Sequence, residues 1–235
     1  MKSRQKKNLI SVMIAALNEE KNIQRTIKET LKLKERYNIE ILVVIDSKTT
    51  DMTAEVSRKL GAKVIHTGKW LGKGAALRLA LPKAKGDIIV QMDADYQFMP
   101  HDIPKMVEPL LNGYDVTLGS RYEKGGEAET GSVTKLRRSG IFFLSLVTSL
   151  FCGQMITDMP AGFKAFKRKV LEDIDMKIDH YGYEAEVIIK AAKKGYKILN
   201  IPIKYKKRVK GNSKLMPFKD GYLFLETILK IGLNL

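Results

Sequence analysis

The chain contains a single cysteine, Cys152, among its 235 residues. One cysteine excludes an internal disulfide, and this usage fits a reducing compartment. The three histidines, His66, His101 and His180, are not spaced as a set of metal ligands. We therefore interpret them as structural and expect no histidine-based metal centre.

Long apolar runs are also missing. No stretch reaches the roughly 18 to 20 apolar residues of a membrane span. The longest candidate, Ile141–Cys152, contains three hydroxyl side chains and follows Arg137 and Arg138. It is either a buried core helix or a helix that lies in a membrane interface. The N-terminal apolar segment Leu9–Leu17 has no cleavage pattern after it, so we expect a first strand and not a signal peptide.

Acidic residues are scarce relative to basic ones. Lys and Arg total 42 against 26 Asp and Glu, a net charge of +16, whereas 44% hydrophobic and 29% charged residues are ordinary for a globular protein. The excess favours anionic partners: nucleic acid, a membrane surface or phosphorylated small molecules. The basic segment Lys197–Lys214 contains only Tyr205 as an aromatic residue within its basic run. Nucleic-acid binding would call for more interleaved aromatic residues, so we do not expect a nucleic-acid partner.

Two nucleotide-binding motifs are absent. The first strand ends without a Gly-X-Gly-X-X-Gly, which counts against a dinucleotide-binding Rossmann site. The segment Gly72-Lys73-Gly74 lacks the spacing of a P-loop. We expect it to open a helix, with Lys73 available to an anion near the helix N-terminus.

Strands and helices alternate through the first half of the chain, which predicts βαβ units, an α/β fold and a mostly parallel sheet. The predicted strands are Leu9–Ala16, Glu40–Ile45, Lys63–His66, Gly86–Met92, Asp115–Gly119 and, later, Ile198–Tyr205. The predicted helices are Glu20–Lys34, Thr50–Leu60, Gly72–Ala84, Ile103–Leu111, a helix ending near Cys152, Gly182–Lys194 and Phe218–Leu235. Between them, 121–134 is expected to be a mobile loop that acts as a lid.

Asp93 and Asp95 follow the apolar run Gly86–Met92 directly. In open α/β sheets ligands bind at the carboxyl ends of the strands. Paired carboxylates there suit Mg²⁺ or Mn²⁺ together with substrate phosphates, and the metal can clamp a diphosphate leaving group. Taken in isolation, two such acids would more often be solvated residues of a turn.

Two further features have two interpretations each. Asp46 follows the second strand, where it either contacts a base or ribose or caps the next helix. Arg208 lies in the basic run, which is either a solvated face or a loop whose arginine binds phosphate through its planar fork.

Taken together, the order of these segments resembles a family 2 glycosyltransferase with the GT-A fold, and more specifically the polyprenyl-phosphate hexose synthases of the dolichol-phosphate mannose synthase type. The resemblance covers about residues 8 to 230. The segments that carry it are 15–19, 44–51, 72–74, 93–97, 119–122, 158–164, 201–203, 208 and 211–215.

The resemblance implies roles for individual residues, carried over by matching position. The donor would be bound by Ala15, Leu17, Glu19, Asp46, Asp93, Ala94 and Lys214. The metal, Mg²⁺ or Mn²⁺, would be held by Asp93, Asp95 and Gln97. The catalytic groups would be Asp95 and the phosphate-binding residues Arg121, one or both of Arg137 and Arg138, and Arg208.

The chain departs from the family pattern near the base. Ala15 and Leu17 replace the usual proline and tyrosine, and Asp46-Ser47-Lys48-Thr49 replaces the usual Asp-Asp-Gly-Ser. The identity of the base therefore stays open, and the donor is GDP-mannose or UDP-glucose.

The expected activity is an inverting transfer of mannose or glucose from the nucleotide sugar to a polyprenyl (dolichyl) phosphate at a membrane surface. A phosphate acceptor is already largely ionised near neutral pH and needs no general base. The alternative is a soluble or saccharide hydroxyl acceptor, which calls for a base, and Glu184 occupies the matching position. We expect a catalytic domain over residues 1–215, an amphipathic C-terminal helix over 216–235 as a second interfacial helix, and a peripheral location on the cytoplasmic face of a membrane.

Overall fold

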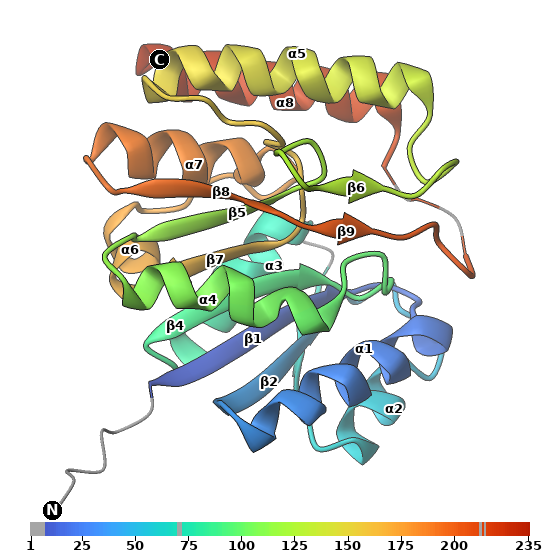
Figure 1. Cartoon of the computed structure of the whole chain (residues 1–235). Coiled ribbons are helices and arrows are strands. Elements are labelled where there is room, and N and C mark those ends of the chain that lie inside the picture. Colours follow the sequence, from blue (N-terminus) through green and yellow to red (C-terminus); the bar gives the residue numbers. More distant parts are fainter. Residues whose placement is uncertain (1–7, 70–71, 212, 214) are drawn as a thin grey trace, which may run out of the picture.

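The computed structural model describes residues 8–69, 72–211, 213 and 215–235. Within these residues the centre is a seven-stranded sheet with the order β3-β2-β1-β4-β7-β5-β8 (Figure 1). Its strands are β1 (Leu9–Ala16), β2 (Asn38–Ile45), β3 (Lys63–His66), β4 (Ile88–Asp93), β5 (Val116–Ser120), β7 (Lys164–Lys167) and β8 (Ile198–Pro202). The helices are α1 (Glu20–Lys32), α2 (Thr53–Lys59), α3 (Lys73–Ala80), α4 (Ile103–Leu111), α5 (Lys135–Cys152), α6 (Arg168–Asp173), α7 (Tyr183–Lys193) and α8 (Pro217–Leu233).

The predicted α/β fold with a mostly parallel sheet is confirmed. Strands β1, β2, β3 and β4 run parallel because a helix connects each to the next. Strand β7, which pairs antiparallel with both β4 and β5, and helix α6 are missing from the predicted elements. The four residues of β7 begin and end with lysine, so they show no apolar run that would predict a central strand.

A small second sheet forms beside the main one. The predicted strand over 198–205 is interrupted at Ile203, and its second part, β9 (Lys204–Tyr205), pairs with β6 (Glu127–Ala128). The segment 121–134 is therefore a loop that contains a short strand. The backbone N–H of Lys206 donates to the carbonyl of Gln97 at 2.9 Å, which holds the chain after β9 against the segment after β4.

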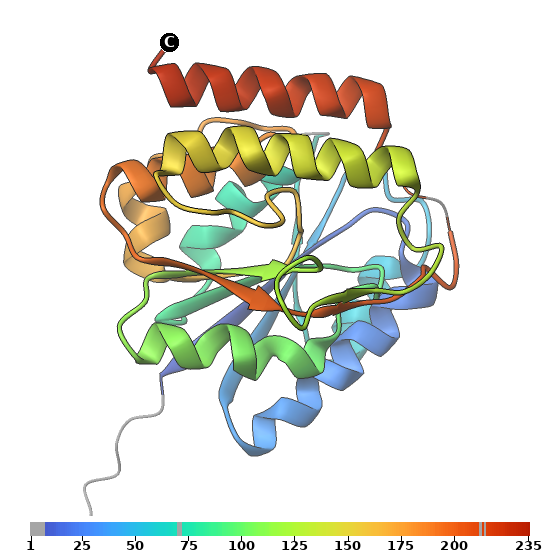
Figure 2. The same cartoon turned by 45° about the horizontal axis from the view of Figure 1, so that its top comes forward.

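Helices cover both faces of the sheet. The helices α1, α2 and α4 pack on one face and α3, α6 and α7 on the other, each over its own apolar cluster. The helices α5 and α8 lie side by side outside α7 (Figures 1 and 2). They form an outer layer on one side of the molecule.

The outer layer exposes many apolar side chains. The buried positions of α5 include Ser145, Thr148 and Ser149. Its exposed apolar positions, which we call the outer face of α5, are Leu136, Phe142, Phe143, Leu146 and Leu150. On α8 the exposed apolar positions are Phe218, Tyr222, Leu229 and Leu233. Leu144, Phe224 and Ile228 pack into the core cluster, so both helices have apolar side chains on two sides. Among the described residues, no helix combines the length and the hydrophobicity needed to cross a bilayer.

Candidate active site

The carboxyl ends of β1, β2 and β4 lie next to one another. Ala15 pairs with Val44 of β2 on one side and with Asp93 of β4 on the other. Asp46 follows the end of β2 directly, and the half-buried Leu17 follows β1. The fold therefore brings four of the predicted donor-binding residues to the edge at which open α/β sheets bind their ligands.

The two acids of the predicted metal site lie at the end of strand β4: Asp93 is its last residue, and Asp95 follows two positions later. The Oδ1 atom of Asp93 lies 2.6 Å from Nζ of Lys73. Asp95 is buried, and its Oδ1 accepts a hydrogen bond from the backbone N–H of Gln97 at 3.1 Å. Between the acids and Gln97, Tyr96 has a φ of 60°, a left-handed conformation that side chains other than glycine rarely adopt. A tight turn thus keeps both acids at the end of the strand.

Arg208 reaches the same acids from the loop after β9. Its Nη2 pairs with Asp95, and its Nη1 lies 3.1 Å from Oε1 of Glu19. Burial and the charge of Asp93 raise the pKa of Asp95 to about 7, and Arg208 acts in the opposite direction. The other oxygen of Glu19 accepts a hydrogen bond from Nδ2 of Asn22 at 2.7 Å. Arg208 therefore connects Glu19, at the predicted nucleotide end, with the carboxylate pair.

Gln97 and Ala94 both have partners within the chain. Nε2 of Gln97 donates to the carbonyl of Lys206 at 2.9 Å and so supports the loop that carries Arg208. Ala94 is buried, and its carbonyl accepts a hydrogen bond from the hydroxyl of Thr26 at 3.1 Å. The metal-binding role of Gln97 and the donor-binding role of Ala94 stay predictions.

Arg121 is buried and paired with Asp158, an acid of the segment 158–164 to which the sequence analysis assigned no role. The Nε and Nη2 atoms of Arg121 donate to the two carboxylate oxygens at 2.7 Å each, and its backbone N–H donates to the same group at 2.9 Å. Burial opposes the charge, but Asp158 outweighs it and raises the pKa of Arg121. The guanidinium to which the resemblance assigns phosphate binding thus already binds a carboxylate, and it lies over the ring of Tyr205.

Arg137 and Arg138 point to different neighbours. Arg137 donates to the hydroxyl of Ser213 at 3.2 Å and to the carbonyl of Leu215 at 2.9 Å. Arg138 lies over the ring of Tyr122. Arg137 is therefore the one connected with the segment that follows Arg208 in the chain.

The two interpretations of Asp46 can be compared with its contacts. Its Oδ1 accepts a hydrogen bond from the backbone N–H of Lys48 at 2.8 Å, so it stabilises the turn after β2. The N-cap of α2 is Met52, and the backbone N–H of Thr53, the first residue of this helix, donates to Oδ1 of Asp51 at 3.0 Å. The capping alternative is wrong for Asp46, and its contact with a base stays a prediction.

Lys214, the remaining predicted donor-binding residue, lies outside the described residues.

A chain of buried charges behind Asp93 was not predicted. Besides Asp93, Lys73 contacts Oε1 of Glu184 at 3.0 Å, and the other oxygen of Glu184 pairs with Lys164. Gln91 also donates to Glu184, at 3.1 and 3.3 Å. The sequence singled out Lys73, Asp93 and Glu184 separately, but it gave no signal that they contact one another, because Glu184 lies 111 positions from Lys73 in the chain.

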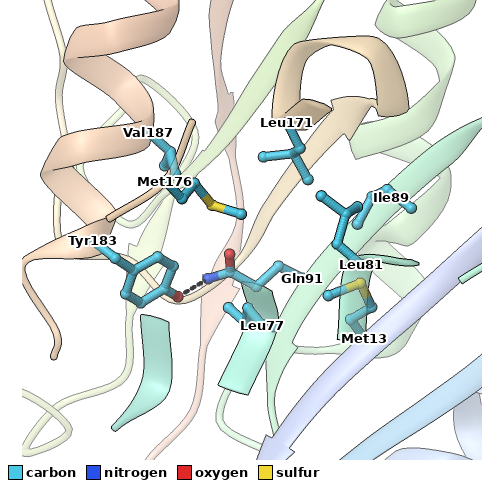
Figure 3. A pocket seen from close by; sticks show the side chains of 9 residues that line it. All are labelled: Met13, Leu77, Leu81, Ile89, Gln91, Leu171, Met176, Tyr183 and Val187. Atoms are coloured by element: carbon cyan, nitrogen blue, oxygen red, sulfur yellow. Dashed lines mark hydrogen bonds between the residues drawn. The ribbon is translucent and has the colours of Figure 1, made fainter. Parts of the chain in front are cut away.

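Two hollows lie near these groups. One, of about 10 Å³, is enclosed by apolar side chains together with Gln91 and Tyr183, which point toward each other (Figure 3). It has room for about one water molecule and not for a ligand. The other, of about 210 Å³, opens beside Glu19 and is lined by Asn18, Glu19, Glu20, Lys21, Asn22, Asp51, Lys210 and Gly211. It adjoins the predicted nucleotide end.

The acids at the end of β4 fit a magnesium or manganese ion that arrives with a diphosphate. Such ions take one or two carboxylates and complete their coordination with water and phosphate oxygens. Asp93 and Asp95 supply two carboxylates at one strand end. In the part of the chain that the structure describes, no cluster of three or more His, Cys, Asp or Glu side chains could bind a metal by itself.

The chain was compared with families and proteins of known sequence. The family model "Glycosyl transferase family 2" matches residues 11–175. A dolichyl-phosphate hexose transferase of Haloferax volcanii is 30% identical over 225 residues, which cover 96% of this chain and 94% of that protein. A dolichol-phosphate mannosyltransferase of Pyrococcus furiosus is 33% identical over 210 residues, 88% of this chain and 59% of that protein.

Solved structures share the fold. Glucosyl-3-phosphoglycerate synthase from Mycobacterium tuberculosis, in complex with Mn²⁺, uridine diphosphate and phosphoglyceric acid, superposes with a TM-score of 0.75. The alignment covers 96% of this chain and 78% of that one, at 23% identity. At this identity the likeness establishes the fold alone.

Proposed function

The chain belongs to glycosyl transferase family 2, and from this premise we propose that it transfers a hexose from a nucleotide sugar to a polyprenyl phosphate, with inversion, at a membrane surface. The relatives named as dolichyl-phosphate hexose transferase and dolichol-phosphate mannosyltransferase support the acceptor class. Mannose and glucose remain the candidate sugars.

The burial of Glu184 and its ion pairs with two lysines are the observation that favours a phosphate acceptor over a hydroxyl acceptor. A hydroxyl acceptor needs a base that can take its proton, and Glu184 was the candidate. Its side chain is 2% exposed and paired with both Lys73 and Lys164. Burial disfavours its charge, but the two lysines outweigh burial and lower the pKa of Glu184. A carboxylate held in this way is a poor proton acceptor and has no open path to a substrate.

A phosphate acceptor has no need of that base. Its second pKa is about 6, so it attacks as an anion near neutral pH. What it needs is positive charge while two anions approach each other. We propose that Arg208 and Arg137 supply this positive charge. Arg208 lies in the loop between β9 and α8, and Arg137 donates to the carbonyl of Leu215 near the end of the same loop.

The donor is proposed to bind along the edge formed by β1, β2 and β4, with Glu19 and Asp46 toward the nucleoside. Asp93 and Asp95 would hold Mg²⁺ or Mn²⁺, which supplies charge neutralisation for the leaving diphosphate. Arg208 now pairs with Asp95, so donor binding would release its guanidinium. The freed fork would then bind the acceptor phosphate in the bidentate geometry that arginine favours.

The outer layer of helices supports a membrane location. A polyprenyl chain leaves a bilayer at a cost of about 0.8 kcal/mol per CH₂, so the enzyme must approach the lipid. The outer face of α5 is apolar, and the exposed Lys135, Arg138 and Lys219 lie in the N-terminal turns of α5 and α8. Apolar side chains beside basic ones suit an anionic interface. We propose peripheral binding on the cytoplasmic face through α5 and residues 216–235, with 1–215 as the catalytic part.

The test is a donor screen with matched acceptors. Purified protein with Mn²⁺ or Mg²⁺ is given GDP-mannose or UDP-glucose and vesicles that contain either a polyprenyl phosphate or the corresponding polyprenol. We expect a glycolipid with the phosphate and none with the alcohol. Transfer to the polyprenol or to a water-soluble sugar hydroxyl at an equal rate would support the hydroxyl alternative and overturn the proposal.

A further inference from the structure

Both acids of the proposed donor site are paired with a cation of the protein itself. Lys73 lies 2.6 Å from Oδ1 of Asp93, and Arg208 pairs with Asp95. Arg208 belongs to a loop, whereas Lys73 is the first residue of α3 and is fixed from behind by Glu184 and Lys164. The charge on Lys73 is therefore a permanent part of the site.

Stability alone does not account for this arrangement. The side chains of Lys164 and Glu184 are 0% and 2% exposed. Removing two charges from water costs about as much as their attraction returns, and apolar replacements of such pairs are often neutral or stabilising. The chain of charges opens toward solvent at Asp93, whose side chain is 30% exposed against 12% for Lys73. The charges of Lys73, Glu184 and Lys164 therefore act on the electrostatic potential at the donor site.

The glycines on either side of Lys73 determine where its side chain lies. Gly72 has a φ of 82°, in the left-handed region that favours glycine. A Cβ atom on Gly74 would lie 2.2 Å from the carbonyl oxygen of Ile178, so a larger residue does not fit there. These two positions let the first turn of α3 press against the segment that leads into α7. Lys73 consequently lies between Asp93 and Glu184.

We infer that Lys73 sets the ligand preference of the donor site, disfavouring the free metal ion and favouring the nucleoside diphosphate. An approaching divalent cation meets an acid whose charge is already offset and a fixed positive charge beside it. A diphosphate is attracted by the same charge. Glu184 and Lys164 are positioning residues that hold Lys73 in place. The inference rests on the proposed donor site, and it assigns Lys73 a role in selecting what enters.

The substitution Lys73→Met tests this assignment. It leaves the Glu184–Lys164 pair intact, so the buried charges remain balanced and the fold should persist. Binding of Mn²⁺ alone is measured by electron paramagnetic resonance, and binding of UDP and of GDP in the presence of EDTA by calorimetry. We expect Mn²⁺ to bind more tightly and the nucleoside diphosphate more weakly, each by a factor on the order of ten, as for charges a few ångströms apart.

The opposite signs separate this role from simple damage, because a distorted site would bind both ligands less well. Lys73→Arg keeps the charge and should stay near wild type in both measurements. Lys230→Met, which removes an exposed lysine paired with Glu226 on α8, is the matched control and should change neither. If Lys73→Met does not fold, by circular dichroism, Lys73→Gln takes its place.

Two results would overturn the inference: both affinities falling together, or neither changing. The measurements need no acceptor and no turnover. If the protein fails to glycosylate polyprenyl phosphate, the proposed function fails while the binding result stands. If it does glycosylate the lipid but the affinities move together, the inference about Lys73 alone is wrong.

Discussion

Arg121 and Asp158 form a buried, two-pronged ion pair, with Nε and Nη2 each 2.7 Å from a carboxylate oxygen. Asp158 belongs to the loop between α5 and β7, and Arg121 follows β5, so the pair joins two segments that line one side of the site. The same guanidinium lies 4.8 Å from the centroid of the Tyr205 ring. A residue that the family resemblance assigns to phosphate is thus part of the framework in this structure.

Breaking this pair should destabilise the protein. Asp158→Asn leaves a buried guanidinium without its counter-charge, which costs about 3–5 kcal/mol. We expect the melting temperature to fall by roughly 10 °C for a chain of this size. The double variant Arg121→Met/Asp158→Leu should recover part of this loss. If the stable double variant also keeps its KM for the acceptor, direct phosphate binding by Arg121 is contradicted.

Asp95→Ala should abolish sugar transfer and metal-dependent nucleotide binding while the fold persists. Arg208 retains Glu19 as a partner in this variant, so no buried cation is stranded. Turnover and Mn²⁺-dependent nucleotide binding are the readouts, and Asp175→Ala, at an exposed acid far along the chain, is the control. Near-normal turnover with unchanged metal dependence would remove Asp95 from the metal site.

Arg208→Ala should lower turnover by orders of magnitude, because a charge-assisted fork to the acceptor phosphate is lost. Arg208→Lys should restore only part of the rate, since lysine keeps the charge without the planar geometry. Lys207→Ala, one residue earlier on the same loop and exposed, should have a small effect. If all three variants match the wild type, the basic loop is a solvated face.

Placing acids on the outer face of α5 should weaken membrane binding. Phe143 and Leu146 are 54% and 56% exposed, so Phe143→Asp/Leu146→Asp introduces charge with little change in packing. We expect less co-sedimentation with anionic vesicles and lower activity on long-chain acceptors, whereas nucleotide binding survives. Wild-type vesicle binding should weaken with salt because basic residues contribute to it.

The control for this pair is Leu111→Asp on α4, an exposed leucine on the opposite face of the sheet. It should not affect vesicle binding. A wild-type protein that ignores vesicles at low salt, or a double variant that binds them as well as the wild type, would remove α5 from the membrane contact.

The sequence predicted the elements of the sheet well where the strands are continuous apolar runs. Strands β1, β2 and β4 have runs of β-branched and apolar residues, and the alternation of strands with helices is enough to place the acids after them at one edge. Strand β7 was not predicted because it is short and begins with Lys164. The buried charge of this lysine is balanced by Glu184 of α7. Short polar strands inside a sheet are specified by tertiary contacts and not by local pattern.

The same reasoning applies to the site. Arg208 and Glu19 are 189 positions apart in the chain, and Lys73 and Glu184 are 111 apart. A single sequence contains no physical signal that pairs such residues. For the segment 141–152, only the structure could show which side chains face inward: Leu144, Ser145, Thr148 and Ser149 are buried, whereas Leu146 and Leu150 are exposed.

Gly162 has a consequence for any attempt to redesign this protein. A Cβ atom at this position would lie 2.2 Å from Oδ2 of Asp93, so only a hydrogen atom separates the loop before β7 from the acid that closes β4. The loop before β7 and the acid at the end of β4 are therefore in direct contact at this position. A loop grafted from another protein, to change what the enzyme glycosylates, must keep a glycine there, or it will move the acid on which the donor depends.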